Sequence, residues 1–387
     1  MKTKQLLNFY GINLCFLLSG LLLGISACQS LENQTNSDTK ATKVTGRSDT
    51  QLVLNNAILE QSSVKGNWQW KIKSEQTVYS NDRQTANLEK VTANLLQDGK
   101  IILKVKGDQG KVLEQGNLVF LQGNVVATDA RNETIIQGDL VEWRPQEHIL
   151  VLSQNFSGTH QNVKLRAEKA TYFTDQEKLE VSGQIIADNI EPWLQLKTER
   201  LVWHIPQQKI LGNTPWKVIH YQEKIVTERL VADGGEWDLE NQTMTLKENI
   251  ELIALSPQLQ IAMDSATWNY QKRTIISDRP MQILDRQRQV TITGNQGNLD
   301  LITNIANLTQ GVQGKRKVNP AQFYANDLTW NIPAQTIEAT GNVFYEQTSP
   351  TLELRGDRAF IKLPENKVVI SSNQNNQRGV ISIVGDR

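Results

Sequence analysis

Cysteine is nearly absent from this sequence. The 387 residues contain only two cysteines: Cys15 lies within an N-terminal apolar run and Cys28 directly after it. No pair is therefore left for a structural disulfide in the rest of the chain. The four histidines are His148, His160, His204 and His220. Because their spacing is not that of metal ligands and no cysteine can join them, we expect no zinc site.

An excess of charge of either sign is missing as well. Lys and Arg together number 41, as do Asp and Glu, so the formal net charge is +0. A nucleic-acid partner normally requires a basic face for its phosphates, and none is expected here. No nucleophile elbow, phosphate loop or pair of catalytic carboxylates stands out in the sequence. We therefore predict that the protein is not an enzyme and uses no cofactor.

A long hydrophobic run occurs at the start of the chain. Lys2 and Lys4 precede an apolar stretch that ends in Ile25-Ser26-Ala27-Cys28. An apolar residue three places before a cysteine, with small residues between, resembles a bacterial lipobox. Residues 1–27 are thus expected to be a lipoprotein signal peptide, with lipid attached to Cys28 after cleavage. The alternative is an uncleaved anchor, because residues 9–27 are nearly long enough to span a bilayer.

Either form of the N-terminus predicts a body that lies outside the cytoplasm and is tethered to a membrane. Residues 28–50 are rich in Asn, Gln, Ser, Thr, Asp and Lys and contain few apolar residues. Such a composition is typical of a disordered tether. Ordered structure is expected to begin at Gln51, and no helical periodicity of useful length follows.

One twelve-residue stretch, LQIAMDSATWNY at 259–270, shows the pattern that organises the chain. Apolar residues alternate from Leu259 to Met263, the alternation then skips one place, and it resumes from Ala266 to Tyr270. Alternation puts every second side chain on one face of a strand. One extra residue lets the strand turn a corner while the apolar face stays inward.

The same pattern recurs about every 31 residues, giving ten copies. With Met263 as the reference, the equivalent anchor positions are Ser74, Gly107, Gly138, Ala167, Thr198, Ala232, Gly294, Ala325 and Gly356. The next place is acidic or Asn in every copy, and several copies have Asn seventeen places after the anchor. Five places after the anchor runs a largely aromatic column, which includes Trp143, Tyr172, Trp203, Trp237, Trp268 and Trp330.

Polar turns at equal offsets separate these strands, for example at 144–147, 205–208 and 331–334. Each repeat is therefore read as two antiparallel strands, which gives roughly twenty strands in all. A unit of this kind buries its apolar face only against its neighbours. The predicted fold is all-β, elongated and open at both ends, V-shaped in section, with an apolar interior running along its length.

Three sets of residues invite a functional reading. The aromatic column is the candidate lining of a lipid groove, and its alternative role is packing in the narrow crease of the V. The small anchors are expected to permit the corner rather than to touch a ligand. The acidic ladder suggests either calcium ligands or exposed corner residues that bond nearby backbone groups, and we favour the latter. The ladder consists of Asp139, Glu168, Glu199, Asp233 and Asp264.

Residues 52–152 resemble the LptC family of periplasmic lipopolysaccharide-export proteins. The likeness is carried by LNNAILEQ, by GNWQWKIKSEQTVYSNDRQTANLEKVTANLLQDGK, and by GNLVFLQGNV and GDLVEW. The later repeats are similar to the OstA-type module of LptA. The resemblance implies an LptC-like part at 51–152 and an LptA/OstA-like continuation at 153–387. It further implies a bent antiparallel β-jellyroll whose groove carries lipopolysaccharide acyl chains, although family members are commonly about half this length and LptC usually keeps an uncleaved helix.

The resulting functional prediction is a component of lipopolysaccharide export on the periplasmic side of the inner membrane. It would accept lipopolysaccharide, or a similar multi-acyl lipid, from the inner-membrane ABC transporter complex and pass it toward the outer membrane. The N-terminal edge is expected to meet the transporter. The C-terminal edge, with its terminal strand at 380–384, is expected to take an LptA-like or outer-membrane partner by strand addition. The alternative is a structural or adhesive β-repeat protein with a packed core and no lipid.

Overall fold

The computed structural model describes residues 51–62, 67–349, 351–372 and 379–384, the last of these as backbone. The chain divides into two units, Met1–Ser48 and Asp49–Arg387, and every described residue belongs to the second. The predicted signal peptide, Cys28 and the whole of the predicted tether lie outside the described residues. None of the described segments forms a helix long and apolar enough to span a bilayer.

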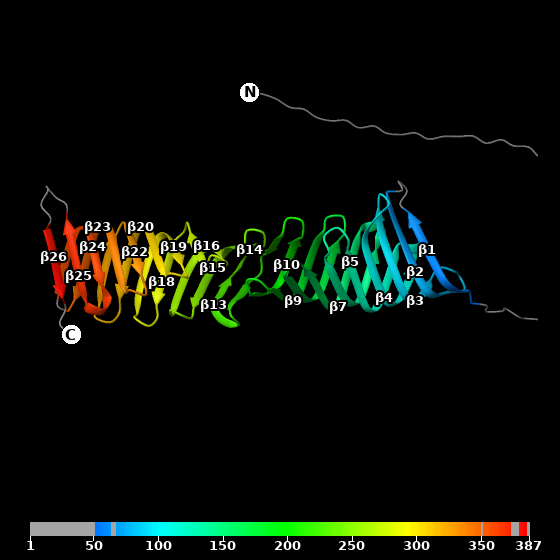
Figure 1. The fold of residues 1–387 in the computed structure, drawn as a ribbon, viewed down its shortest axis with the longest axis horizontal. Coiled ribbons are helices and arrows are strands. Elements are labelled where there is room, and N and C mark those ends of the chain that lie inside the picture. The colour runs from blue at the N-terminus through cyan, green and yellow to red at the C-terminus, as the bar shows by residue number, and fades with distance from the viewer. Residues whose placement is uncertain (1–50, 63–66, 350, 373–378, 385–387) are drawn as a thin grey trace, which may run out of the picture. The chain divides into compact units, whose positions relative to one another are not determined.

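The second unit is one antiparallel sheet of 26 strands (Figure 1). Its first ten strands are β1 (Val53–Ser62), β2 (Trp68–Tyr79), β3 (Ala86–Gln97), β4 (Lys100–Leu113), β5 (Leu118–Asp129), β6 (Ile135–Arg144), β7 (Ile149–His160), β8 (Val163–Phe173), β9 (Lys178–Asn189) and β10 (Leu194–His204). Short 3-10 turns are η1 (Glu114–Gly116), η2 (Pro145–Glu147) and η3 (Leu363–Glu365). The predicted all-β repeat architecture is confirmed.

The remaining strands continue the sheet in the same direction. They are β11 (Lys209–Gly212), β12 (Trp216–Gln222), β13 (Ile225–Ala232), β14 (Gly234–Asp238), β15 (Thr243–Ala254), β16 (Leu259–Asn269), β17 (Thr274–Ser277), β18 (Met281–Asp285), β19 (Val290–Asp300), β20 (Ile305–Arg316), β21 (Ala321–Ala325), β22 (Asp327–Asn331), β23 (Thr336–Thr348), β24 (Thr351–Lys362), β25 (Lys367–Ser372) and β26 (Gly379–Val384). The predicted domain boundary at residue 152 falls within β7, and the division of the chain at that point stays a prediction.

Most of the long strands turn a corner near their middle. Between β5 and β6, Gln122 pairs with Leu140 and Val125 pairs with Gly138, so two residues of β5 face one residue of β6. The two extra positions have left-handed backbones, with φ of 77° at Gly123 and 46° at Asn124. Equivalent register shifts recur in the later pairs of long strands. The parity shift seen in the sequence is therefore a β-bulge.

Four strands predicted as continuous are split at the corner, which explains why the structure has more strands than expected. β10, for instance, pairs with β11 through Val202 and Leu211 and with β12 through Leu196 and Val218. The gap between β11 and β12 contains Pro215, which has no N–H to donate to a ladder. Alternation alone could not show this interruption, because both halves keep the inward parity.

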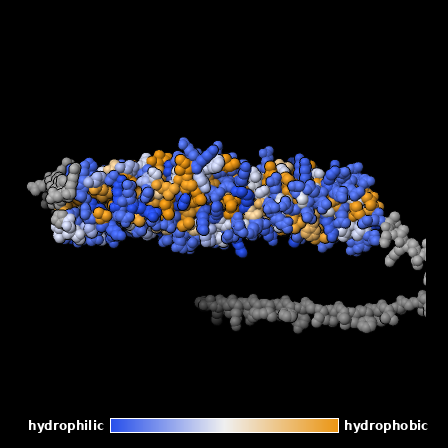
Figure 2. Space-filling view, turned by 90° about the horizontal axis from the view of Figure 1, so that it is seen from below, coloured by the Kyte–Doolittle hydropathy of each residue, from blue (hydrophilic) through white to orange (hydrophobic). Residues whose placement is uncertain are grey.

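The interior is apolar and continuous. Along β16 the inward residues from Leu259 to Trp268 are buried, while Asp264 at the corner is exposed. Buried side chains of this kind form one cluster along the described part of the sheet. The face seen in Figure 2 is mostly hydrophilic, with hydrophobic side chains in separate patches. The predicted inward and outward faces are thus confirmed.

Both ends of the sheet are edge strands. Within the described ranges β1 pairs only with β2, and β26 pairs only with β25. The predicted opening strand and terminal strand are confirmed, and each leaves one side of its backbone available for pairing.

Candidate functional site

The acidic ladder forms hydrogen bonds that close the corners. At the β6–β7 corner, Nδ2 of Asn155 donates to a carboxylate oxygen of Asp139 at 2.5 Å. The same pair, sixteen residues apart, recurs as Asn124–Asp108 at 2.7 Å, Gln184–Glu168 at 2.8 Å and Asn249–Asp233 at 2.5 Å. The expected corner role is therefore right, but the donors are chiefly side-chain amides of the next strand rather than backbone groups. No group of three potential metal-ligating side chains occurs in the described part of the chain.

The small anchors differ in how tightly they are packed. A Cβ atom at Gly356 would lie 2.5 Å from Cγ2 of Ile370, and one at Gly294 would lie 2.8 Å from Cβ of Leu308. At Gly138 the nearest atom would be 3.6 Å away, an ordinary contact. Close approach of neighbouring strands thus requires glycine at two of these corners and merely allows it at others.

The aromatic column is fully buried, but it does not lie in the crease. Its six members are at most 1% exposed, and each is the penultimate residue of its strand, next to a turn. In β16, Ala266 is the first inward residue after the corner, and Trp268 lies one inward position farther out. The column is packed in the interior, as its alternative role requires, but it lies beyond the crease, because one inward residue, Ala266 in β16, stands between it and the anchor. Its role as the lining of a lipid groove stays a prediction.

A row of buried polar residues occupies the opposite ends of the strands. The polar row consists of Asp129, His160, Asn189, His220 and Asp285, spaced about 31 residues or a multiple apart and at most 7% exposed. Each lies at or near the end of β5, β7, β9, β12 or β18. Sequence reasoning missed the row. The sequence did contain a signal for it, because each member occupies an inward-facing position of its strand, where the repeat otherwise has an apolar residue.

The polar row of one arm of the V meets the aromatic column of the other. Oη of Tyr172 donates to Asp129 at 2.6 Å. The rings of His160 and Trp203 meet edge to face with centroids 5.8 Å apart, and His220 and Trp268 repeat this geometry at 5.8 Å. We call the turns beyond the polar row lip 1, those beyond the aromatic column lip 2, and the line where they meet the seam.

Polar latches hold the seam at intervals. The Arg131 guanidinium on lip 1 donates to the Thr174 carbonyl at 2.7 Å and lies 3.5 Å from the Glu177 carboxylate, both on lip 2. Near the C-terminal end, Arg316 donates to Oδ1 of Asn366 at 2.8 Å.

A third latch is the most buried. Arg273, on lip 2, pairs with the Glu228 carboxylate, which is 1% exposed, and it donates to the side-chain oxygen of Gln222 at 3.2 Å. His220 lies 2.6 Å from the same carboxylate. Burial alone would raise the pKa of Glu228, but hydrogen bonds from His220, Thr227 and Arg273 outweigh it and lower that pKa.

Within the described ranges, no backbone-to-backbone hydrogen bond joins the two lips. Throughout the described ranges, the backbone hydrogen bonds outside regular strand pairing connect turns of the same lip or close the corners. The strand ladders likewise run from neighbour to neighbour, never across the V. Because a latch is a few polar contacts rather than a strand ladder, we expect the seam to open more readily than the paired strands separate.

Several indole N–H groups inside the body have no hydrogen-bond partner. Among the described residues these are Nε1 of Trp143, Trp203, Trp216, Trp268 and Trp330. Trp237 differs, since its Nε1 donates to Oη of Tyr270 at 3.1 Å. A buried donor without an acceptor costs about 1–3 kcal/mol. The interior thus carries a line of unused donors among apolar side chains.

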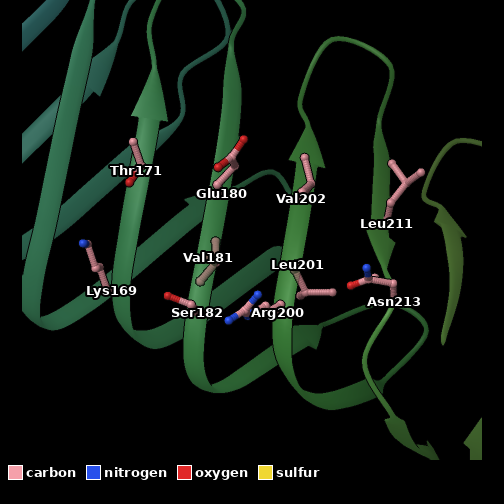
Figure 3. Close-up of a pocket in the computed structure, with 11 residues that line it drawn as sticks. Lys169, Thr171, Glu180, Val181, Ser182, Arg200, Leu201, Val202, Leu211 and Asn213 are labelled. Carbon is pink, nitrogen blue, oxygen red and sulfur yellow. The ribbon is translucent and has the colours of Figure 1, made fainter. Parts of the chain in front are cut away.

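The cavities show how tightly the interior is filled. Inside the C-terminal repeats a cavity of about 30 Å³ is lined by Phe323, Ile337, Tyr345 and Ile361, room for roughly one water molecule. A larger cleft of about 340 Å³ lies on the outer face of β8–β11 and is lined by polar and apolar residues alike. Figure 3 shows Lys169 and Arg200 of that cleft near the bends of their strands. With its lips together, the V is a packed body rather than an open trough.

This geometry can be set beside known proteins. Residues 19–185 match the family model described as "Lipopolysaccharide-assembly, LptC-related". This segment is similar to the LptC-related family. The resemblance predicted from the sequence is confirmed over this part of the chain, which is the part that contains β1 to β8 and the first latch.

Other comparisons add little. The crystal structure of LptH, the LptA homologous periplasmic component of the lipopolysaccharide transport device of Pseudomonas aeruginosa, is similar over 30% of this chain and 82% of that one. Its sequence identity is 14% and its TM-score 0.26. A score this low supports no conclusion about the present chain. None of the curated proteins matches the sequence.

Proposed function

We propose that this protein is a periplasmic component of lipopolysaccharide export that carries acyl chains in its interior. The observation that carries the proposal is an apolar interior enclosed by two lips that no described backbone-to-backbone hydrogen bond joins, in a chain whose residues 19–185 match an LptC-related family model. Each CH₂ group moved out of water is worth about 0.8 kcal/mol. A lipid with several acyl chains therefore needs a continuous apolar path, and parting the lips would open one.

The unused indole donors indicate what kind of chain fits this interior. A plain alkyl chain offers no acceptor, whereas acyl chains joined by ester or amide bonds carry oxygens at their head ends. Nε1 of Trp203 and Trp268, close to the seam, would donate to such oxygens once the lips part. Binding would then remove the cost of the buried donors.

The proposed partners are those that could meet the N-terminal segment and the two edge strands of the sheet. Lipidation at Cys28, or an uncleaved N-terminal segment, would tether the body to the inner membrane. β1 would face the ABC transporter complex, and β26 would receive an LptA-like or outer-membrane partner by strand addition. An upstream ATPase would supply the work of extraction, so the body itself needs no catalytic residues.

Native mass spectrometry with lipid extraction tests the proposal on full-length protein purified gently from its own envelope. We expect co-purifying lipopolysaccharide or another multi-acyl lipid. Trp203→Phe keeps an aromatic ring but removes the donor and should reduce the retained lipid. Trp70→Phe should not, because Nε1 of Trp70 already donates to Gln61 at 3.0 Å. Lipid-free protein from an envelope that contains lipopolysaccharide would overturn the proposal.

The alternative of a structural or adhesive body also has an observation in its favour, namely the packed interior with a cavity of only about 30 Å³. In that case the seam would never part. Photoreactive residues placed at Trp203 or Trp268 would then give no adduct with acyl chains in cells, and the body would unfold at the same temperature with or without added lipid.

A further inference from the structure

The hairpin tips of lip 1 expose large apolar side chains in the C-terminal half of the molecule. Trp193, between β9 and β10, is 52% exposed, and Ile225, the first residue of β13, is 67% exposed. Leu255 and Val318, on later tips of the same lip, are 41% and 61% exposed. The tips of lip 2 along these repeats expose one comparable residue, Ile302 at 63%. Along these repeats, exposed apolar tips are thus concentrated on lip 1.

Basic side chains stand among these apolar tips. Lys224 lies next to Ile225, Arg286 occupies the β18–β19 tip, and Lys317 lies next to Val318, all exposed. The same tips carry two exposed carboxylates, Glu191 and Glu223; Lys315 adds a further positive charge. Although the whole chain has no net charge, this rim is locally basic. We call the tips from Trp193 to Val318 the lip-1 rim.

The rim is a continuous, ordered row. Neighbouring tips are joined by backbone hydrogen bonds, from Tyr221 N to Trp193 O at 3.0 Å, and from Leu255 N to Thr227 O at 3.0 Å. The bond from Lys317 N to Gln289 O at 3.1 Å continues the row. Adjacent strands lie about 4.8 Å apart. The apolar side chains therefore project together from one edge, and their exposure does not come from frayed hairpins.

We propose that the lip-1 rim docks on the surface of an anionic lipid leaflet. A line of projecting tips contacts a plane along its whole length, whereas a protein partner of ordinary size would favour a compact patch. Trp and branched aliphatic residues insert shallowly at the boundary of headgroups and acyl chains. Lys and Arg beside them are attracted to lipid phosphates.

This orientation has a direct structural consequence. Lip 1 borders the seam, as the Arg316–Asn366 latch shows. Docking of the rim would hold the seam against the leaflet, so lipid could pass between the membrane and the interior without crossing water. The docking itself rests on the rim alone and does not require that the interior carry lipid.

Site-specific photocrosslinking tests the docking. Full-length protein with a photoreactive residue in place of Ile225 or Val318 is reconstituted with vesicles of equal parts phosphatidylglycerol and phosphatidylcholine. The matched control carries the probe at Gln207, an exposed tip residue of lip 2. We expect at least about tenfold more lipid adduct at 225 and 318 than at 207, with the excess lost in pure phosphatidylcholine or at high salt.

A charge variant sharpens the result. Lys224→Gln, Arg286→Gln and Lys317→Gln together should lower the adduct yield at 225 about tenfold or more while the far-ultraviolet circular dichroism stays unchanged. Equal adduct at 207 and 225 would mean that the N-terminal anchor alone brings the body near lipid, and would overturn the proposal. The proposal would also be overturned if no lipid adducts formed, or if the probes in native envelopes crosslinked only to proteins.

Discussion

At the scale of single residues, the corner is the most repetitive feature of the molecule. Asn155 combines a left-handed backbone, with φ of 56°, with a hydrogen bond to Asp139. Asn tolerates this conformation better than most residues do, and its side-chain amide donates a hydrogen bond to the carboxylate at the exposed bend. The Asn recognised seventeen places after the anchor is thus a conformational as well as a bonding residue.

Two substitutions at Asn155 separate these roles. Asn155→Gly keeps the left-handed backbone and loses the hydrogen bond, so we expect a loss of about 1 kcal/mol in the free energy of unfolding. Asn155→Ala loses both and should cost about 1 kcal/mol more. Chemical denaturation measures the difference. Equal stability of the two variants would show that the backbone conformation contributes nothing.

The indole donors allow a matched comparison. Trp203→Phe and Trp237→Phe remove the same atoms from fully buried positions. Only Trp237 has a partner, Tyr270, whose pKa is raised to about 12 chiefly by burial. Trp237→Phe should therefore destabilise the body by about 1–2 kcal/mol more than Trp203→Phe, because it leaves a buried hydroxyl with one contact fewer. A larger loss for Trp203→Phe would mean that its N–H is satisfied in solution.

Histidine in the polar row makes the seam sensitive to acid. Burial lowers the pKa of His160 below its usual value of 6.5, so the folded state favours the neutral ring. The unfolded chain takes up a proton first as the pH falls, and stability is lost below about pH 6.5 as the pH approaches the lower folded pKa. Thermal unfolding from about pH 7 to about pH 5 should show a steeper decline for the native chain than for His160→Gln; parallel curves would exclude His160 as the cause.

At the scale of elements, the latches decide how firmly lip 1 and lip 2 hold together. Arg273, on the turn between β16 and β17, faces Glu228 of β13. Removal of the arginine leaves the buried carboxylate with His220 and Thr227 as its remaining donors. Loss of one partner of a buried pair is costly, whereas loss of both is much less so.

Arg273→Gln should therefore lower the free energy of unfolding by about 3 kcal/mol, and the double variant Arg273→Gln with Glu228→Gln should recover much of that loss. Hydrogen exchange of the β12–β13 and β16–β17 turns should rise in the single variant only. Arg355→Gln, at an exposed pair with Glu353 on β24, is the control and should change stability little. If the control is as costly as Arg273→Gln, the latch has no special role.

At the scale of the whole molecule, stability depends on neighbouring repeats rather than on a central core. Most strands pair with the strands directly before and after them in the chain. Energy in such a body is close to a sum over repeats and their interfaces. The molecule should accordingly tolerate loss of a complete repeat, provided that the direction and parity of the strands are kept.

Deletion of residues 233–263 removes one full repeat and joins Ala232 to Asp264, which occupy consecutive positions of the pattern. We expect a folded β-protein with a somewhat lower melting temperature, measured by circular dichroism and calorimetry. Deletion of residues 249–263 removes the second half of β15 and the first half of β16 and joins Glu248 to Asp264. The two remaining half-strands run in opposite directions and cannot form one continuous strand, so this variant should aggregate. Similar behaviour of the two deletions would contradict the repeat architecture.

The sequence alone determined the repeat, the bulge, the inward face of each strand and the two edge strands. These features are local, because alternation along β16 or the skip after Met263 lies within one strand and its nearest neighbours. The recurring turns likewise fixed where one strand ends and the next begins. The LptC likeness was also readable there, since it is carried by continuous segments.

Only the tertiary structure decided that the V is closed. The contacts of Asp129 with Tyr172 and of His160 with Trp203 join residues 43 positions apart, an offset that is not a multiple of the repeat. This offset arises because the strands tilt and twist, so that one arm of the V is displaced along the body relative to the other. No pattern within one strand encodes that displacement, so the polar row, the latches and the position of the aromatic column beside the seam became visible only in the folded chain.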